Sequence, residues 1–168
     1  EGMSMLNNIY KRGFSITILI FTILFLYSKE NNAIIDKEEL SKEFDLSKCE
    51  EIDLLDYISI ESGMGYIYKN ITGAMTSYME LFMFSSMGKV IYSVYENKNQ
   101  WKIHKEEYFY KQPYDTENQT LLETNFFIDS DEVVYSVSSQ GKGKVEEKVS
   151  RSILKIRELV EEIKVDLE

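Results

Sequence analysis

The stretch from Lys89 to Tyr110 reads KVIYSVYENKNQWKIHKEEYFY. Two runs within it, 89–95 and 101–110, alternate apolar with polar residues and are rich in aromatic and β-branched types, a pattern typical of strands. The polar residues at 96–100 separate the two runs and have the composition of a turn. This stretch therefore predicts a β-hairpin.

The following segment repeats the same pattern. Two more alternating runs, 121–128 and 133–139, flank the acidic turn DSDE at 129–132, and a polar loop at 111–120 precedes them. The turn lacks the glycine and the distal glutamate of a calcium-binding loop, so we expect a solvated turn. Two successive hairpins predict an antiparallel β meander in the middle of the chain.

A helical period replaces the alternation after the glycine-containing joint at 140–144. The apolar residues there follow a spacing of 4, 3, 4 and 3, namely Val149, Ile153, Ile156, Val160 and Ile163. That spacing places them on one face of an amphipathic helix. We expect this helix to pack across the domain's own sheet. A two-heptad coiled coil is the alternative, although convincing coiled coils extend over three or four heptads.

Upstream of the meander, the spacing predicts helices. Residues 36–44 and 47–58 are expected to form two short helices, and 57–71 a hairpin around the glycine-rich turn at 62–65. Four methionines at 75, 79, 83 and 87 recur every fourth residue and predict another helix, with Gly88 as its left-handed cap. We expect the methionine side chains to pack in the core, and an exposed binding surface is the less favoured alternative.

These elements together predict an α+β fold. N-terminal helices lead into an antiparallel β meander, and the C-terminal amphipathic helix packs on the sheet. The expected domain organisation is a leader at residues 1–33 followed by a single α+β domain at 34–168.

The leader is predicted from a basic pair followed by an apolar run. Lys11, Arg12 and Gly13 precede fourteen uncharged residues, Phe14 to Tyr27. A helix of that length reaches about 21 Å, which is short of a hydrocarbon core roughly 30 Å thick. The run therefore suits the apolar part of an export signal better than a membrane span. A membrane anchor with local bilayer thinning and a buried core helix are the alternatives.

The same residues carry a resemblance to a known family. A polar leader that ends in Lys11, Arg12 and Gly13, followed by Phe14 and an apolar helix, resembles the start of a type IV prepilin. The resemblance covers about the first 28 residues. It implies cleavage after Gly13 by a dedicated peptidase and packing of the helix into a filament core. At the fifth mature position this chain has Ile18, where most pilins carry glutamate.

Charge and cysteine content narrow the classes of partner. The net charge is −10, and such a surface repels phosphate backbones, so we expect no nucleic-acid partner. Cys49 is the single cysteine, so no intramolecular disulfide can form. Its neighbours Glu50 and Glu51 disfavour a reactive thiolate. A protein partner is expected, with membrane contact through residues 14–27 and oligomerisation as further options.

The sequence offers no pattern for catalysis or cofactor binding. His104 is the only histidine, and no group of histidines, cysteines and carboxylates has the spacing of a metal site. We therefore predict no catalytic, cofactor-binding or metal residues and no enzymatic activity. If Ile103 faces the core, His104 faces the other side of its strand.

The predicted function is binding or assembly by an exported or membrane-anchored bacterial surface protein. Three alternatives remain: a minor pilin-like filament subunit, a cytosolic interaction domain whose apolar run is a core helix, and an enzyme of unrecognised class. The leader residues for processing are Lys11, Arg12, Gly13 and Phe14. The candidate interaction stripe consists of Met75, Met79, Met83, Ile156 and Val160.

Overall fold

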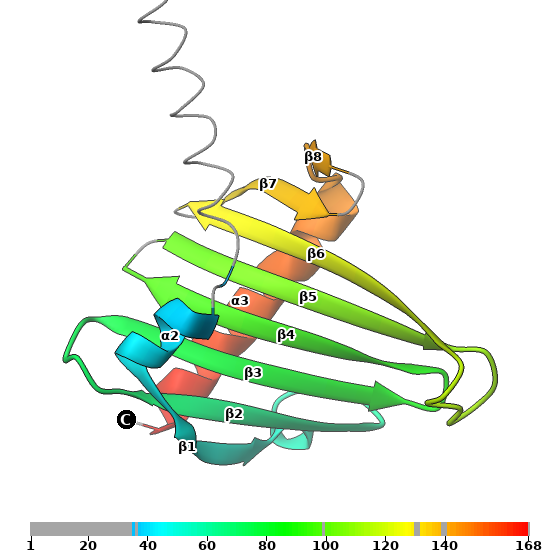
Figure 1. The fold of residues 1–168 in the computed structure, drawn as a ribbon, viewed down its shortest axis with the longest axis horizontal. Coiled ribbons are helices and arrows are strands. Elements are labelled where there is room, and N and C mark those ends of the chain that lie inside the picture. The colour runs from blue at the N-terminus through cyan, green and yellow to red at the C-terminus, as the bar shows by residue number, and fades with distance from the viewer. Residues whose placement is uncertain (1–34, 36, 99, 130–131, 139–140, 168) are drawn as a thin grey trace, which may run out of the picture. The chain divides into compact units, whose positions relative to one another are not determined.

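The computed structural model describes residues 35, 37–98, 100–129, 132–138 and 141–167. They belong to one compact unit, Ala33–Glu168. Figure 1 shows an antiparallel sheet with a long helix on one side and a short helix on the other. The elements in chain order are α2 (Lys37–Glu43), β1 (Phe44–Asp53), η1 (Leu54–Asp56), β2 (Ser62–Asn70), β3 (Thr76–Ser85), β4 (Gly88–Asn97), β5 (Gln100–Tyr110), β6 (Gln119–Asp129), β7 (Glu132–Ser138), β8 (Gly141–Gly143) and α3 (Glu147–Leu167).

All eight described strands form a single sheet in the order β1 to β8, so each strand pairs with its neighbour in sequence. The predicted α+β fold with N-terminal helices is wrong, because the described part of the chain is dominated by this sheet and has one long helix, α3. The hairpins predicted at 89–110 and 121–139 are confirmed as β4–β5 and β6–β7.

Two predictions for the upstream segment are wrong, namely the helix at 47–58 and the hairpin at 57–71. The expected helix at 47–58 is the second half of β1 followed by the single turn η1, and the glycine-rich turn expected at 62–65 lies inside β2. Ile52 and Leu54 pack over Gly65, where a Cβ would lie 2.5 Å from the Ile52 side chain. The glycines of this strand therefore allow a close approach and do not form a turn.

The helix predicted at the methionines is wrong, because most of this segment is β3, which pairs with β4 along its whole length and with β2 from Tyr78 to Phe84. Gly88 is the first residue of β4 and not a helix cap. A Cβ on Gly88 would lie 2.2 Å from the carbonyl oxygen of Tyr108, so glycine is required here by the neighbouring backbone. The turn of residues 86–87 connects β3 to β4 directly.

Helix α3 covers one face of the sheet. Four of the five apolar residues predicted to face the sheet are buried there, with Leu159 as an additional member: Ile153, Ile156, Val160 and Ile163. They pack with side chains of the central strands, including Met79, Val94, Ile103 and Ile128. Val149 lies in the first turn and is 38% exposed, so the apolar contact begins one turn later than predicted.

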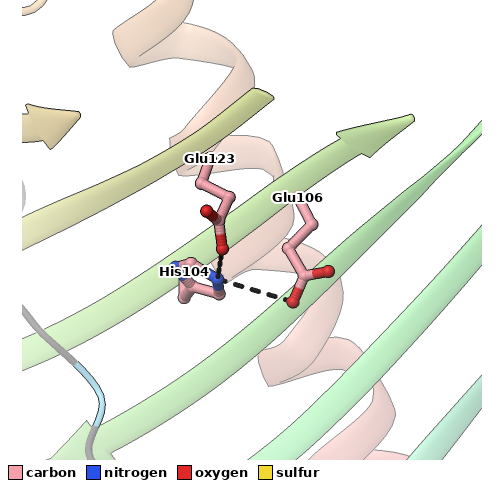
Figure 2. A group of neighbouring side chains, drawn as sticks. All are labelled: His104, Glu106 and Glu123. Atoms are coloured by element: carbon pink, nitrogen blue, oxygen red, sulfur yellow. Dashed lines mark ion pairs between the residues drawn. The ribbon is translucent and has the colours of Figure 1, made fainter. Parts of the chain in front are cut away.

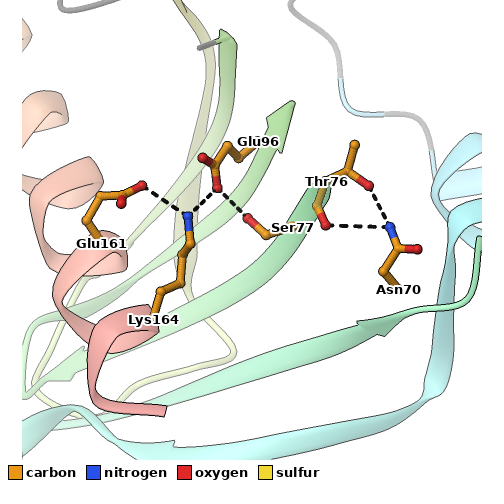
Figure 3. Close-up of polar contacts among 6 residues, drawn as sticks. All are labelled: Asn70, Thr76, Ser77, Glu96, Glu161 and Lys164. Atoms are coloured by element: carbon orange, nitrogen blue, oxygen red, sulfur yellow. Dashed lines mark hydrogen bonds and ion pairs between the residues drawn. The ribbon is translucent and has the colours of Figure 1, made fainter. Parts of the chain in front are cut away.

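A polar network holds the C-terminal half of α3 against the sheet (Figure 3). Lys164 Nζ lies 2.7 Å from Glu96 Oε2 on β4 and 3.1 Å from Glu161 Oε1 on its own helix. Ser77 on β3 donates a hydrogen bond of 2.7 Å to the same Glu96 oxygen. One carboxylate thus connects the helix to two strands.

Helix α2 covers one end of the opposite face. The predicted helix at 36–44 is confirmed as Lys37–Glu43. Leu40 and Phe44 are buried against Tyr78, with the Tyr68 and Tyr95 rings beside them. The β2–β3 connection lies close by, where the Asn70 amide donates to Thr76 Oγ1 at 2.6 Å (Figure 3). The rest of this face has no helix over it in the described residues (Figure 1).

The predicted leader, with Lys11, Arg12, Gly13 and Phe14, lies outside the described residues. Within the ranges that are described, no helix has both the length and the apolar content needed to cross a membrane.

Candidate functional site

The face of the sheet opposite α3 combines exposed apolar and aromatic side chains, such as Leu121 and Phe84, with ionisable ones such as Glu123. Side chains alternate between the two faces of a strand. Val94, Ile103 and Phe126 pack with α3, so their neighbours in sequence point to the other side. We call that side, over β2 to β6 and beyond the reach of α2, the open face.

An apolar patch occupies the end of the open face that lies away from α2. We define the apolar patch as Met64, Phe82, Phe84, Ile91 and Leu121. Strand register places Met64, Phe82 and Ile91 side by side across three strands. Phe84 is 41% exposed and Leu121 45%.

Two aromatic contacts hold the patch in place. The Tyr66 ring meets the Phe82 ring edge-on, with 5.4 Å between the ring centres. Lys89 and Tyr108 lie between Phe84 and Leu121 in the register, and the Lys89 ammonium sits 4.2 Å from the centre of the Tyr108 ring. Such a cation–π contact orders both side chains and keeps the patch continuous across the strands.

Next to the patch, the only histidine of the chain meets two carboxylates (Figure 2). His104 and Glu106 alternate along β5 and share the open face, and Glu123 on β6 pairs directly with Glu106. His104 Nε2 lies 3.5 Å from Glu106 Oε1 and 3.7 Å from Glu123 Oε1. We call these three residues the His104 cluster.

Neighbouring side chains orient this cluster. His104 Nδ1 lies 2.9 Å from Asn125 Oδ1, and the Tyr108 hydroxyl donates to Glu106 Oε2. The hydrogen bond to Glu106 is the main reason why the pKa of Tyr108 is raised to about 12. Because Tyr108 occupies one oxygen of Glu106, the other oxygen is directed at His104.

The cluster has the donor set of a cation site. One nitrogen and two carboxylate oxygens lie within 4.8 Å of one another. Sequence reasoning missed this site because Glu123 reaches it only through the β5–β6 register, across the loop at 111–118. The available signal was the alternation of His104 and Glu106 on one strand face, which by itself gives two ligands.

The predicted interaction stripe does not form one exposed surface. Met79, Ile156 and Val160 are buried in the core beneath α3. Met83 packs at the edge of that core, and Met75 is 86% exposed in the loop before β3. The structure thus brings four of the five residues together in the core and leaves Met75 apart.

A hollow of about 420 Å³ lies on the α3 side at the end of β3, β4 and β5. Its lining includes Met83, Val90, Glu107 and Phe109. Glu107 is engaged by Lys105 Nζ at 2.8 Å. The lining is mainly apolar, and both of its carboxylates have partners, because Glu61 accepts a hydrogen bond from the backbone N–H of Ser86. The hollow therefore offers fewer groups for specific recognition than the open face.

Comparison with known proteins finds no related protein. No protein-family model, no curated protein and no solved structure matches this chain. Inferences about function therefore rest on the surfaces that the chain itself presents.

Proposed function

We propose that this chain is a non-enzymatic bacterial protein, exported or anchored at the cell surface, which binds another protein through the open face of its sheet. The observation that carries the proposal is the apolar patch. Phe84 and Leu121 stay substantially exposed although α3 and α2 cover other parts of the same sheet. Large exposed apolar side chains that lie together on a folded domain mark interaction sites.

The composition and shape of the surface favour a protein partner. Methionine and aromatic residues are enriched at protein interfaces, and a broad sheet face suits a large, flat contact better than a small molecule, which prefers a concavity. The Tyr66–Phe82 contact and the Lys89–Tyr108 contact fix these side chains before binding. Rigid anchors reduce the entropy lost on association.

Charge indicates the kind of protein. Glu80, Glu106 and Glu123 flank the patch on the open face, and the chain as a whole carries a net charge of −10. A second copy of the chain would bring like charges together, whereas a partner rich in lysine and arginine would pair with these carboxylates. We therefore propose a basic protein partner with an apolar contact surface.

Site-specific photocrosslinking in the native host tests the binding proposal. A photoreactive phenylalanine analogue at Phe84 is compared with the same analogue at Val165, which is 71% exposed on α3. We expect one defined adduct from position 84 and none from 165, with a basic protein identified by mass spectrometry. With that protein purified, Phe84→Asp should weaken binding at least tenfold, and Val165→Asp should leave it unchanged. Equal labelling from both positions, or no adduct, would refute the open face as the binding surface.

The location proposal rests on Lys11, Arg12 and the uncharged run at 14–27. Fractionation of the native protein with N-terminal sequencing tests it. A mature start near Ile34 indicates secretion, a start at Phe14 the pilin-like alternative, and an intact leader in the membrane an anchor. An Ile18→Asp, Leu24→Asp double variant should accumulate in the cytoplasm. Unchanged export of this variant would contradict the proposal and favour the cytosolic interaction domain.

A further inference from the structure

We propose that the His104 cluster binds a divalent transition-metal ion of the Zn²⁺ class through His104 Nε2, Glu106 and Glu123. This goes beyond the proposed function, because apolar contact through Phe84 and its neighbours requires no metal. Glu106 and Glu123 are shared with the proposed contact to a basic partner, whereas His104 is not. The site would lie on the open face, beside Ile91, which pairs with Glu106 across β4 and β5.

The three ligand atoms lie within 4.8 Å of one another, close to the separations around a zinc ion. Zinc binds histidine nitrogen and carboxylate oxygen at about 2.0–2.2 Å in tetrahedral geometry, so two ligands are separated by roughly 3.3–3.6 Å. His104 Nε2 lies 3.5 Å and 3.7 Å from the two carboxylate oxygens. The remaining adjustment falls to Glu123, whose side chain is 57% exposed and free to move inward.

The orientation of the imidazole is suited to metal binding. Asn125 Oδ1 can only accept a hydrogen bond, so the contact of 2.9 Å places the proton of His104 on Nδ1. The lone pair of Nε2 then points at the two glutamates. A hydrogen-bonded second nitrogen is the usual arrangement of a metal-ligating histidine, and Tyr108 provides the same support for Glu106.

The pairing of Glu106 with Glu123 is an independent reason for a cation here. These residues are directly opposite in the β5–β6 register. Like charges in directly opposed cross-strand positions destabilise a sheet. A positive charge beside the two carboxylates converts this repulsion into attraction, whether it is a protonated His104 or a divalent ion bound by the imidazole and both carboxylates, and Zn²⁺ titration distinguishes the two.

The histidine nitrogen and the two carboxylate oxygens indicate which metal ions the site prefers. Mg²⁺ and Ca²⁺ prefer oxygen ligands alone, whereas imidazole suits zinc and its neighbours in the first transition row. Three protein ligands leave a coordination position for water, as in zinc sites that are open to solvent.

Calorimetric titration of the purified chain with ZnCl₂ tests the site, with MgCl₂ and CaCl₂ as comparison ions. We expect one equivalent of Zn²⁺ to bind, and neither comparison ion to bind at the same concentrations. His104→Gln and Glu123→Gln should each weaken Zn²⁺ binding at least tenfold. Glu117→Gln removes a carboxylate from the exposed β5–β6 loop and should leave the affinity unchanged. Circular dichroism confirms that each variant is folded.

Cobalt provides a second measurement at the same residues. Bound Co²⁺ should give visible absorption bands that are lost in His104→Gln and kept in Glu117→Gln. The proposal is overturned if Zn²⁺ binding does not saturate, or if His104→Gln binds Zn²⁺ as well as the native chain does, because either result means dispersed binding by surface acids. Crosslinking from Phe84 does not depend on this outcome, so the two proposals fail separately.

Discussion

The two faces of the sheet are formed by the same strands but differ in what covers them. On β3, Met79 and Leu81 are fully enclosed beneath α3, whereas Phe82 is half-buried and Phe84 is 41% exposed on the open face. The alternation of a strand thus assigns neighbouring residues to different tasks. Odd-numbered positions of β3 stabilise the domain, and even-numbered positions beyond α2 are available for binding.

We expect the largest loss of unfolding free energy when a charge is placed beneath α3. Val160 is completely buried, so Val160→Asp would enclose a carboxylate that has no partner there. We expect the variant to lose roughly 4 kcal/mol or more of unfolding free energy. Val165→Asp, on the exposed side of the same helix, should unfold at nearly the native urea concentration. Similar urea midpoints for the two variants would mean that α3 does not pack on the sheet.

A cavity on the covered face should lower the free energy of unfolding less than a buried charge does. Met79→Ala removes a buried side chain from the core and should lower the unfolding free energy by about 2–5 kcal/mol. Met75→Ala is the matched control, because this methionine is exposed in the loop, and we expect a change within about 0.5 kcal/mol. Urea denaturation of both variants makes the measurement. A small loss for Met79→Ala would show that the segment does not form the core.

On the open face, truncation should affect binding far more than stability. Phe84→Ser removes an exposed ring, and we expect the unfolding free energy to fall by less than about 1 kcal/mol. Thermal unfolding followed by circular dichroism measures this. A loss comparable to that of Met79→Ala would contradict the distinction between the two faces.

An effect of similar size concerns Lys164 and depends on pH. Burial lowers the pKa of Lys164, but the hydrogen bonds to Glu96 and Glu161 outweigh burial and leave the pKa above its ordinary value. The folded state therefore holds this proton more tightly than the unfolded state does. The resulting stabilisation is complete below the unfolded pKa of about 10.4 and is lost as the pH rises through the folded pKa.

We therefore expect Lys164→Met to lose about 1 kcal/mol at pH 7, and the difference from the native chain to shrink above about pH 10. Urea melts of both proteins at several pH values measure this difference. Tyrosines with raised pKa values titrate in the same range, but they contribute equally to both proteins. A difference that stays constant up to pH 11.5 would mean that the Glu96 contact does not stabilise the fold.

The sequence predicted the elements whose periods are unambiguous. The alternation at 89–95 and 101–110 has a period of two, and the apolar spacing at 149–163 has a period between three and four, so the β4–β5 hairpin and α3 were both expected. The methionines at 75, 79, 83 and 87 recur every four residues. A period of four matches one face of a helix and also one face of a strand, and pairing with β2 and β4 decided in favour of the strand.

The candidate site was predictable only in part. The side of the strand on which His104 lies follows from Ile103, which is buried. The meeting of Glu106 with Glu123 depends on the β5–β6 register, which the polar loop at 111–118 does not specify. The apolar patch likewise combines residues from β2, β3, β4 and β6, and no single segment contains its pattern.

The order of the elements along the chain determines when the core can close. Each strand pairs with the one before it, so the meander can form progressively as the chain emerges from the ribosome or from a membrane pore. Helix α3 follows every strand of the sheet, and until it arrives the side chains of Val94, Ile103 and Ile128 face water. Until α3 packs on the sheet, a nascent chain therefore exposes an extended apolar surface, and such a surface favours aggregation.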